Sequence, residues 1–359
     1  MPLTRPFPAV PRGPAARAAL FLLPALLLLL PACTARADDT GGGTAPFTIE
    51  DERITESSGL QASERHPGVY WTHNDSGYAP RVYAVDSATG QTVATVTLEG
   101  VEGRDLESIH LGPDGDLYVG DIGDNFDGAW PHVWIYRFPE PERLADVALT
   151  PVVYTVRYED GPRDAEALMV HPGTGRVYIA SKKGDATGAL YAGPEQLTAE
   201  GVNVFRRVAD TELQVTGGAF SPDGTRLVLR GYFAAEMYRW DPDGPPEEIG
   251  TVTVPLQRQG ESVTFTRDGR TLMFGSEGLR SQVRPVALDD ELLPDSAREE
   301  PEGGDGTDRA DGREERDGNG GDAEGGTDGT GADGEREVPL LLIGLVLAGA
   351  LLFALRKRK

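Results

Sequence analysis

Carboxylates recur at matching positions ahead of strand-like apolar runs in this sequence. Asp105 and Glu107 precede one run, Asp164 and Glu166 precede another with the same spacing, and Glu261 begins a third. Carboxylates that gather in one place repel one another unless protons or a cation intervene. Carboxylate oxygens are the hard ligands that Ca²⁺ prefers. The pattern therefore predicts a calcium-type site, with Glu107 and Glu166 also candidates for catalysis.

A second set of polar residues lies mainly after the second apolar run of each unit. Asp121 and Asp124 join the metal candidates, and Lys182, Arg230 and Tyr232 join the catalytic candidates. Asp and Asn at strand ends and the repeated acids have a structural alternative, because Asp and Asn commonly cap turns and acids can accept backbone N–H bonds. His110 and His171 are expected to be structural. The remaining polar residues form a predicted binding rim: Glu56, His73, Asn74, Asp75, Asn125, Lys183 and Glu277.

Short β-strands in a repeating unit must position these residues. Residues 46–292 contain runs of Val, Tyr, Leu, Ile and Phe, broken by turns such as Pro113-Asp114-Gly115. Repeats of roughly 45–60 residues with four strands each are typical of a β-propeller. We therefore expect an all-β protein, with units that begin at Ser58, Glu107, Glu166, Thr216 and Glu261.

The number of strands favours five blades. The units from Glu107 and from Thr216 each contain four runs, whereas the unit from Glu261 contains three. A run at residues 46–49 supplies a fourth strand if it pairs with the last unit, which would close the ring and hide an exposed sheet edge. Six blades follow instead if the long interval between Glu107 and Glu166 conceals a poorly matching repeat.

The topology of such a blade predicts which face carries the site. In an antiparallel unit, the start of the innermost strand and the end of the second strand lie at the same edge. Both sets of polar residues are therefore expected on one face around the axis. The Pro-Asp-Gly turns are expected on the other face.

The repeat pattern also carries a family resemblance. Asp-x-Glu-(Ala/Ser)-(Leu/Ile), a short turn and (Leu/Val)-Tyr-(Val/Ile) resemble the blades of calcium-dependent β-propeller phytases and related esterase-like domains, and more loosely gluconolactonase- and NHL-type propellers. The resemblance covers residues 46–292 and implies axial calcium ions that bridge substrate phosphates. Two departures are the five visible units, where those phosphatases have six, and the non-acidic Thr216-Gly217-Gly218. The resemblance to these phytases implies carboxylate ligands at Asp105, Glu107, Asp164, Glu166 and Glu261, and phosphate contacts at Lys182, Arg230 and Tyr232.

The two ends of the chain predict its location. Three arginines and an apolar run at residues 18–30 are typical of a secretory signal peptide, residues 1–37, with lipidation at Cys33 as the alternative to cleavage after Ala37. A short linker at 38–45 precedes the propeller. Residues 293–337 predict a disordered, acidic, Gly-rich stalk. Residues 338–355 predict a transmembrane helix, and the basic tail at 356–359 is expected in the cytoplasm.

Charge and cysteine content exclude some function classes. The net charge of −24 disfavours nucleic-acid binding, and a single Cys excludes a disulfide framework or a thiolate zinc site. The preferred prediction is a monomeric recognition head at the cell surface that binds a cell-envelope ligand or protein. The alternative is a metal-dependent hydrolase whose substrates are phosphate esters or lactones.

Overall fold

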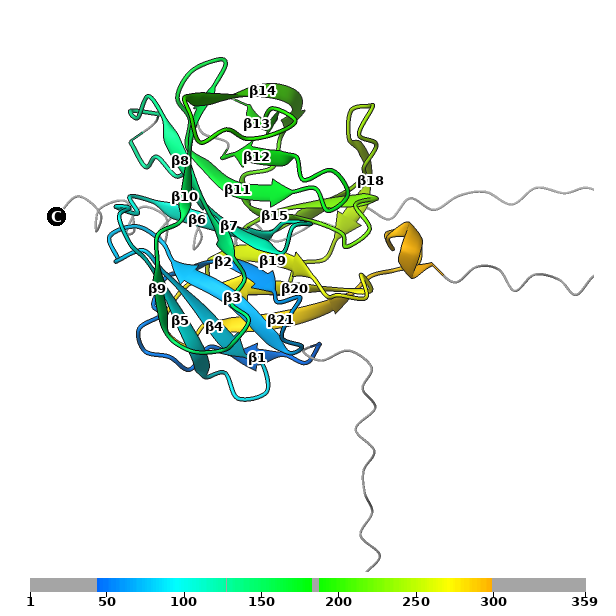
Figure 1. Ribbon diagram of the computed structural model, residues 1–359. Helices are drawn as coiled ribbons and strands as arrows, with labels where there is room; N and C mark the ends of the chain where they lie inside the picture. Colours follow the sequence, from blue (N-terminus) through cyan, green and yellow to red (C-terminus); the bar gives the residue numbers. More distant parts are fainter. Residues whose placement is uncertain (1–43, 127, 183–186, 299–359) are drawn as a thin grey trace, which may run out of the picture. The chain divides into compact units, whose positions relative to one another are not determined.

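The computed structural model describes residues 44–126, 128–182 and 187–298, and this part of the chain is all-β. Its strands form antiparallel meanders arranged as in a β-propeller (Figure 1). No helix in the described ranges is long and apolar enough to cross a membrane. The expected signal peptide, transmembrane helix and basic tail lie outside the described residues, as do Lys183 and most of the expected stalk.

The first sheet has four antiparallel strands and an added fifth. β9 belongs to the connection that follows β8, and it pairs in parallel with β5, where Val147 lies opposite Val96. The longest repeat interval of the sequence therefore contains this added strand. The sheet consists of β2 (Ser57–Ala62), β3 (Val69–Asn74), β4 (Arg81–Asp86), β5 (Thr92–Leu98) and β9 (Val147–Leu149).

The second sheet contains two four-stranded meanders. They are joined at their outermost strands, because β10 and β14 pair in parallel between residues such as Thr155 and Val202. One meander is β6 (Leu106–Leu111), β7 (Asp116–Asp121), β8 (Val133–Pro139) and β10 (Val152–Tyr158). The other is β11 (Ala165–Val170), β12 (Val177–Ser181), β13 (Gly188–Ala192) and β14 (Val202–Thr211).

The last two sheets have four strands each. The first of them is β15 (Val215–Phe220), β16 (Arg226–Gly231), β17 (Ala235–Arg239) and β18 (Glu247–Val252). The other is β19 (Gly260–Phe265), β20 (Thr271–Ser276), β21 (Gln282–Ala287) and β1 (Phe47–Thr48). The N-terminal strand β1 thus lies beside β21, with Phe47 opposite Val283 (Figure 1).

The core is divided into clusters between consecutive meanders. On β16, Leu227 and Leu229 pack toward β11–β13, while Val228 packs toward β19 and β20. Alternate side chains of a strand point to opposite faces, so a strand buried on both faces contributes to two clusters. This explains why the central strands read as continuous apolar runs rather than as alternating patterns.

The packed part of the chain continues beyond β21 to Arg298. Leu293 is buried, and Asp295–Ala297 forms a short 3₁₀-helix whose Ala297 is also buried. The fully buried guanidinium of Arg226 lies 2.8 Å from the Asp295 carboxylate. Residues 293–298 therefore pack against the propeller, although composition alone places them in the stalk.

Candidate functional site

A β-bulge marks the start of each innermost strand. The pairing register of β2, β6, β11, β15 and β19 with the next strand slips there. Bulges commonly re-aim side chains near functional sites. These five strands contact one another in a closed cycle, so the bulges bring equivalent side chains to one edge of the axis. The residues in the bulges are Ser58, Glu107, Glu166, Thr216 and Glu261.

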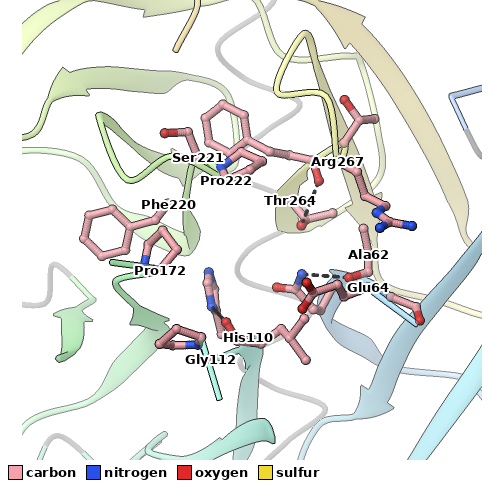
Figure 2. Close-up of a pocket in the computed structure, with 16 residues that line it drawn as sticks. Ala62, Glu64, His110, Gly112, Pro172, Phe220, Ser221, Pro222, Thr264 and Arg267 are labelled. Atoms are coloured by element: carbon pink, nitrogen blue, oxygen red, sulfur yellow. Dashed lines mark hydrogen bonds between the residues drawn. The ribbon is translucent and has the colours of Figure 1, made fainter. Parts of the chain in front are cut away.

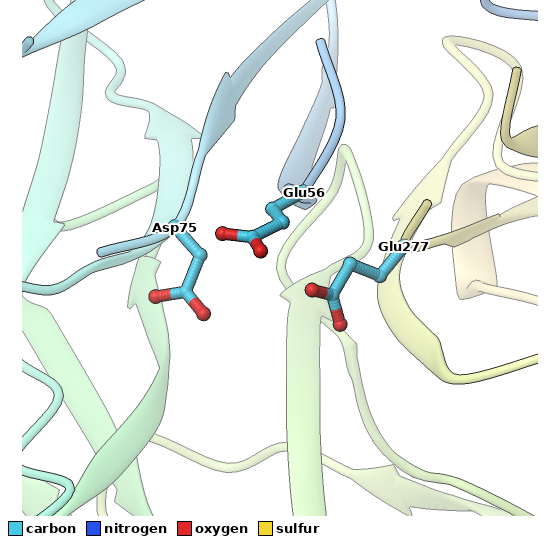
Figure 3. Close-up of side chains that lie close together, drawn as sticks. All are labelled: Glu56, Asp75 and Glu277. Carbon is cyan, nitrogen blue, oxygen red and sulfur yellow. The ribbon is translucent and has the colours of Figure 1, made fainter. Parts of the chain in front are cut away.

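Three carboxylates converge beside the first two of these strands. Asp75, Asp105 and Glu107 each place an oxygen within 4.8 Å of the others. Asp75 also belongs to a half-buried group with Glu56 and Glu277, whose carboxylates face one another with the same mutual distance limit (Figure 3). The predicted metal residues Asp105 and Glu107 are therefore neighbours. Asp75, predicted only as part of the rim, joins both groups.

Gly123 makes room for the buried part of this cluster. A Cβ atom at Gly123 would lie 2.6 Å from Asp105 Oδ2 and 2.6 Å from Glu107 Oε1. No side chain fits at that distance, so a larger residue would displace both carboxylates. Gly123 thus forms the floor on which the two acids lie.

The hydrogen bonds of the cluster leave one buried oxygen unused. Asn125 Nδ2 donates to Asp105 Oδ2 at 3.0 Å, and Ser58 Oγ donates to Glu107 Oε2 at 3.1 Å. Asp105 Oδ1 accepts no hydrogen bond from any residue that the structure describes, although Asp105 is only 1% exposed. A buried carboxylate oxygen without a donor is costly. A cation bound by Asp75, Asp105 and Glu107 would satisfy it, and the all-oxygen donor set suits a hard cation such as Ca²⁺.

Burial and mutual repulsion shift the protonation of the axial acids. Burial, with the Asp75 charge, raises the pKa of Asp105 to about 8. Burial and the neighbouring Glu166 raise the pKa of Glu107 and of Glu261 well above the usual range. Burial also raises the pKa of Glu166 to about 7, although Lys182 opposes the shift. Without a cation, protons relieve the repulsion among these carboxyls.

Lys182 and Tyr232 lie beside these acids. The Lys182 ammonium pairs with the Glu166 carboxylate. Burial raises the pKa of the half-buried Tyr232, and the charge of Glu261 adds to the shift. Both side chains therefore belong to the axial group, and the Lys182 charge is balanced by Glu166.

Arg230 was predicted as a phosphate contact, which requires an accessible guanidinium, but its side chain is buried. It is fully buried, and its Nη1 donates to the carbonyls of Ser262 and Gly275, both at 2.6 Å. Its Nη2 donates to Gln257 Oε1 at 3.1 Å. Burial lowers its pKa to about 10. These contacts tie β16 to β19 and β20, so the guanidinium serves packing.

Several other predicted residues hold the loops. Asp121 accepts the backbone N–H of Asp105 at 2.9 Å and the hydroxyl of Tyr136 at 2.6 Å. Asp124 Oδ2 accepts the Trp130 N–H at 2.7 Å. Three further predicted residues bond to backbone groups. Asp164 Oδ1 accepts the Asp124 N–H, and Asn74 Oδ1 accepts the N–H groups of Thr55 and Glu56. His73 Nδ1 donates to the Asn74 carbonyl. Their turn-capping alternative describes these contacts.

A cavity of about 430 Å³ lies on the opposite face (Figure 2). The Pro-Asp-Gly side of the meanders lines it, with Pro113, Pro222 and Arg267. His110 stands at its wall, where Nδ1 donates to the Leu111 carbonyl at 3.0 Å, and burial lowers its pKa to about 4. None of the predicted metal residues lines this cavity.

Comparisons with known proteins find little sequence relationship. No family model matches the chain, and no curated protein matches it. A PQQ-bound aldose sugar dehydrogenase from Streptomyces coelicolor aligns at 13% identity over 69% of this chain and 100% of that chain, with a TM-score of 0.41. A luciferin-regenerating enzyme aligns at 14% identity over 72% of this chain and 90% of that chain, with a TM-score of 0.41. Likeness at this level carries no functional argument.

Sequence reasoning missed the supporting residues of the site. Ser58 and Thr216 mark repeat starts in the sequence, but nothing there shows that they lie in bulges. Gly123 reads as a turn glycine, because the two carboxylates that need its missing side chain are 16 or more residues away in sequence. The repeat alignment was the available signal, since it places Ser58 and Thr216 in register with Glu107.

Proposed function

We propose that the axial carboxylates bind a calcium-type cation and that the protein is a metal-dependent hydrolase of carboxylic esters or lactones. The observation that carries the proposal is the buried Asp105 and Glu107 pair, which lies with Asp75 around Gly123 and leaves Asp105 Oδ1 without a hydrogen-bond donor among the described residues. A bound cation would stabilise negative charge that develops on a carbonyl oxygen.

The residues around the proposed cation site have the protonation that hydrolysis needs. Glu166, with a pKa of about 7, can accept a proton near neutral pH. Tyr232 stays protonated because its pKa is raised, so its hydroxyl remains a hydrogen-bond donor. Lys182 and Arg230 are already paired with Glu166 and with backbone carbonyls. This favours an uncharged carbonyl substrate over a phosphate ester.

Thermal unfolding of the full-length protein, with calcium or with chelator, tests the cation site. Calcium at 100 times its dissociation constant should stabilise the fold by about 2.7 kcal/mol. The double variant Asp105→Asn with Glu107→Gln should lose this response, and so should Gly123→Ala. Gly244→Ala is the matched control, because a Cβ there meets no atom closer than 3.6 Å. An unresponsive wild type, or a double variant that still responds, contradicts the proposal.

Hydrolysis of phenyl acetate and δ-valerolactone, with phenyl phosphate as the comparison, tests the enzymatic part. We expect calcium-dependent turnover of the first two and little of the third. Calcium binding without turnover would leave the cation site standing and remove the hydrolase.

We further propose that the protein has five blades, with β1 as the outer strand of the last blade. We also propose that the propeller lies outside the cytoplasm, on a stalk that leads to a C-terminal membrane anchor. Pairing of β1 with β21 and the closed cycle of innermost strands support the blade count. The resemblance to phytase-like propellers and the recognition-head alternative stay predictions.

A further inference from the structure

Exposed apolar side chains gather on the loops of the axial face. The described residues include ten exposed large hydrophobic side chains. Five of them are valines on the strands β5, β9, β10 and β14, such as Val93 and Val208. The other five lie in loops, with Leu256 91% exposed and Phe233 73% exposed. We refer to these five as the apolar crown: Tyr78, Phe126, Phe233, Leu256 and Leu279.

All five crown residues lie at the edge that carries the carboxylates. Tyr78, Phe126, Phe233 and Leu279 follow the second strand of their meanders, and Leu256 precedes the innermost strand β19. In an antiparallel meander these connections lie at one edge. The cavity of Figure 2 lies at the other edge and contains none of them.

The crown loops are also the loops that supply the axial site. Phe233 directly follows Tyr232, and Phe126 directly follows Asn125, the donor to Asp105. Leu279 comes two residues after Glu277, which faces Asp75 and Glu56. The Tyr78 hydroxyl lies 2.8 Å from Thr55 Oγ1, next to Glu56. A ligand at the axial carboxylates therefore lies at the same edge as these apolar side chains.

Three cations of this face are already engaged. Lys182 pairs with Glu166, and Arg230 donates to backbone carbonyls. The Arg104 guanidinium stacks 3.9 Å from the Trp130 ring centroid and 3.8 Å from that of Trp134. Exposed apolar side chains that share one edge with a polar site favour a ligand with an apolar part.

We infer that the ligand of the axial site is an amphiphile: an ester or lactone whose polar group reaches the axial carboxylates and whose alkyl chain contacts the apolar crown. The inference rests on the proposed function for the polar group. The alkyl chain is assigned by the crown, since the exposed Phe233 and Leu279 lie in the same loops as Tyr232 and Glu277. An apolar chain gains affinity with each methylene that leaves water.

Binding of a homologous series of γ-lactones to the calcium-loaded, full-length protein tests this inference. The dissociation constant should fall by about twofold per methylene, which is half of the free energy of full burial, so γ-decalactone should bind about 60-fold more tightly than γ-butyrolactone. The double variant Phe233→Ser with Leu279→Ser should reduce this gain to less than about fivefold. The matched control is Val93→Ser with Val208→Ser, which removes exposed apolar surface away from the crown and should keep the full gain.

The outcomes separate the inference from the proposed hydrolase. Chain-length-dependent binding without turnover would support the crown and remove the hydrolase. Turnover with affinity that is independent of chain length would overturn the crown and leave the hydrolase. The crown inference is also overturned if no lactone binds, or if the crown variant and the valine control show the same gain.

Discussion

Burial shifts the pKa of the axial acids and the pKa of the buried histidines in opposite directions. Burial raises the pKa of Asp105 to about 8 and that of Glu166 to about 7, because it disfavours the carboxylate. Burial lowers the pKa of His73 and of His110 to about 4, because it disfavours the imidazolium. Asp105, His73 and His110 are therefore uncharged in the folded, cation-free protein near pH 6, whereas the Lys182 ammonium opposes protonation of Glu166.

The pH dependence of stability should reveal the acids separately from the histidines. The unfolded chain releases the Asp105 and Glu166 protons near their ordinary pKa values of 3.8 and 4.5, whereas the folded protein holds them until about pH 8 and 7. The free energy of unfolding should therefore fall as pH rises through these values. His73 and His110 have the opposite effect, but only below their unfolded value of 6.5.

In chelator, the Tm of the full-length protein should thus fall steadily between pH 6.5 and 8.5. The variant Asp105→Asn with Glu166→Gln should show a much smaller fall, because it carries neither proton. Saturating calcium should also reduce the fall, since a cation keeps the carboxylates ionised. A wild-type Tm that rises with pH in chelator would contradict the assignment of raised pKa values to these acids.

Among the elements, the short strand β1 connects the beginning of the described chain to its last sheet. It contributes only two residues to the pairing with β21. Phe47 and the following Ile49 are nevertheless buried in one cluster with Tyr70 of β3 and Met273 of β20. The N-terminal segment thus packs between the first and the last meander, which are far apart in sequence.

Deleting residues 38–50 should destabilise the protein strongly. Each buried side chain of this kind contributes about 1.5–3 kcal/mol, so loss of Phe47 and Ile49 should lower the unfolding free energy by about 3–6 kcal/mol and leave β21 unpaired. Deletion of residues 299–337 is the control and should leave the Tm unchanged, because the packed contacts of Leu293, Asp295 and Ala297 remain. Equal Tm values for both deletions in thermal unfolding, or equal midpoint concentrations in urea unfolding, would refute the role of β1.

For the whole molecule, the acidic, Gly-rich segment after Arg298 is proposed to connect the propeller to a membrane anchor. Protease added to intact cells should cut within residues 299–337, because such composition gives little apolar surface to bury. The propeller should be released as one soluble fragment, with a small stub left in the membrane. The released fragment is measured by immunoblot and mass. A propeller that stays cell-bound, in cells whose envelope admits the protease, would contradict this arrangement.

The sequence by itself determined the elements that local pattern controls. Turn sequences such as Pro113-Asp114-Gly115 separate apolar runs of strand length, and β6, β11 and β19 begin within one residue of the unit starts expected at Glu107, Glu166 and Glu261. The repeat alignment also identified Glu107, Glu166 and Glu261 as equivalent positions. Strand formation and turns depend on near neighbours in the chain, so a periodic sequence contains the information that specifies them.

Only the tertiary structure decided which polar residues share the axial site. Glu107 and Arg230 both came from the same pattern of polar residues at strand ends. Glu107 lies in a bulge, with its carboxylate near those of Asp105 and Asp75. Arg230 instead donates hydrogen bonds to the carbonyls of Ser262 and Gly275. The floor at Gly123 and the added strand β9 likewise depend on segments distant in sequence. Bulge register and packing between meanders are set by these long-range contacts, and no local pattern encodes them.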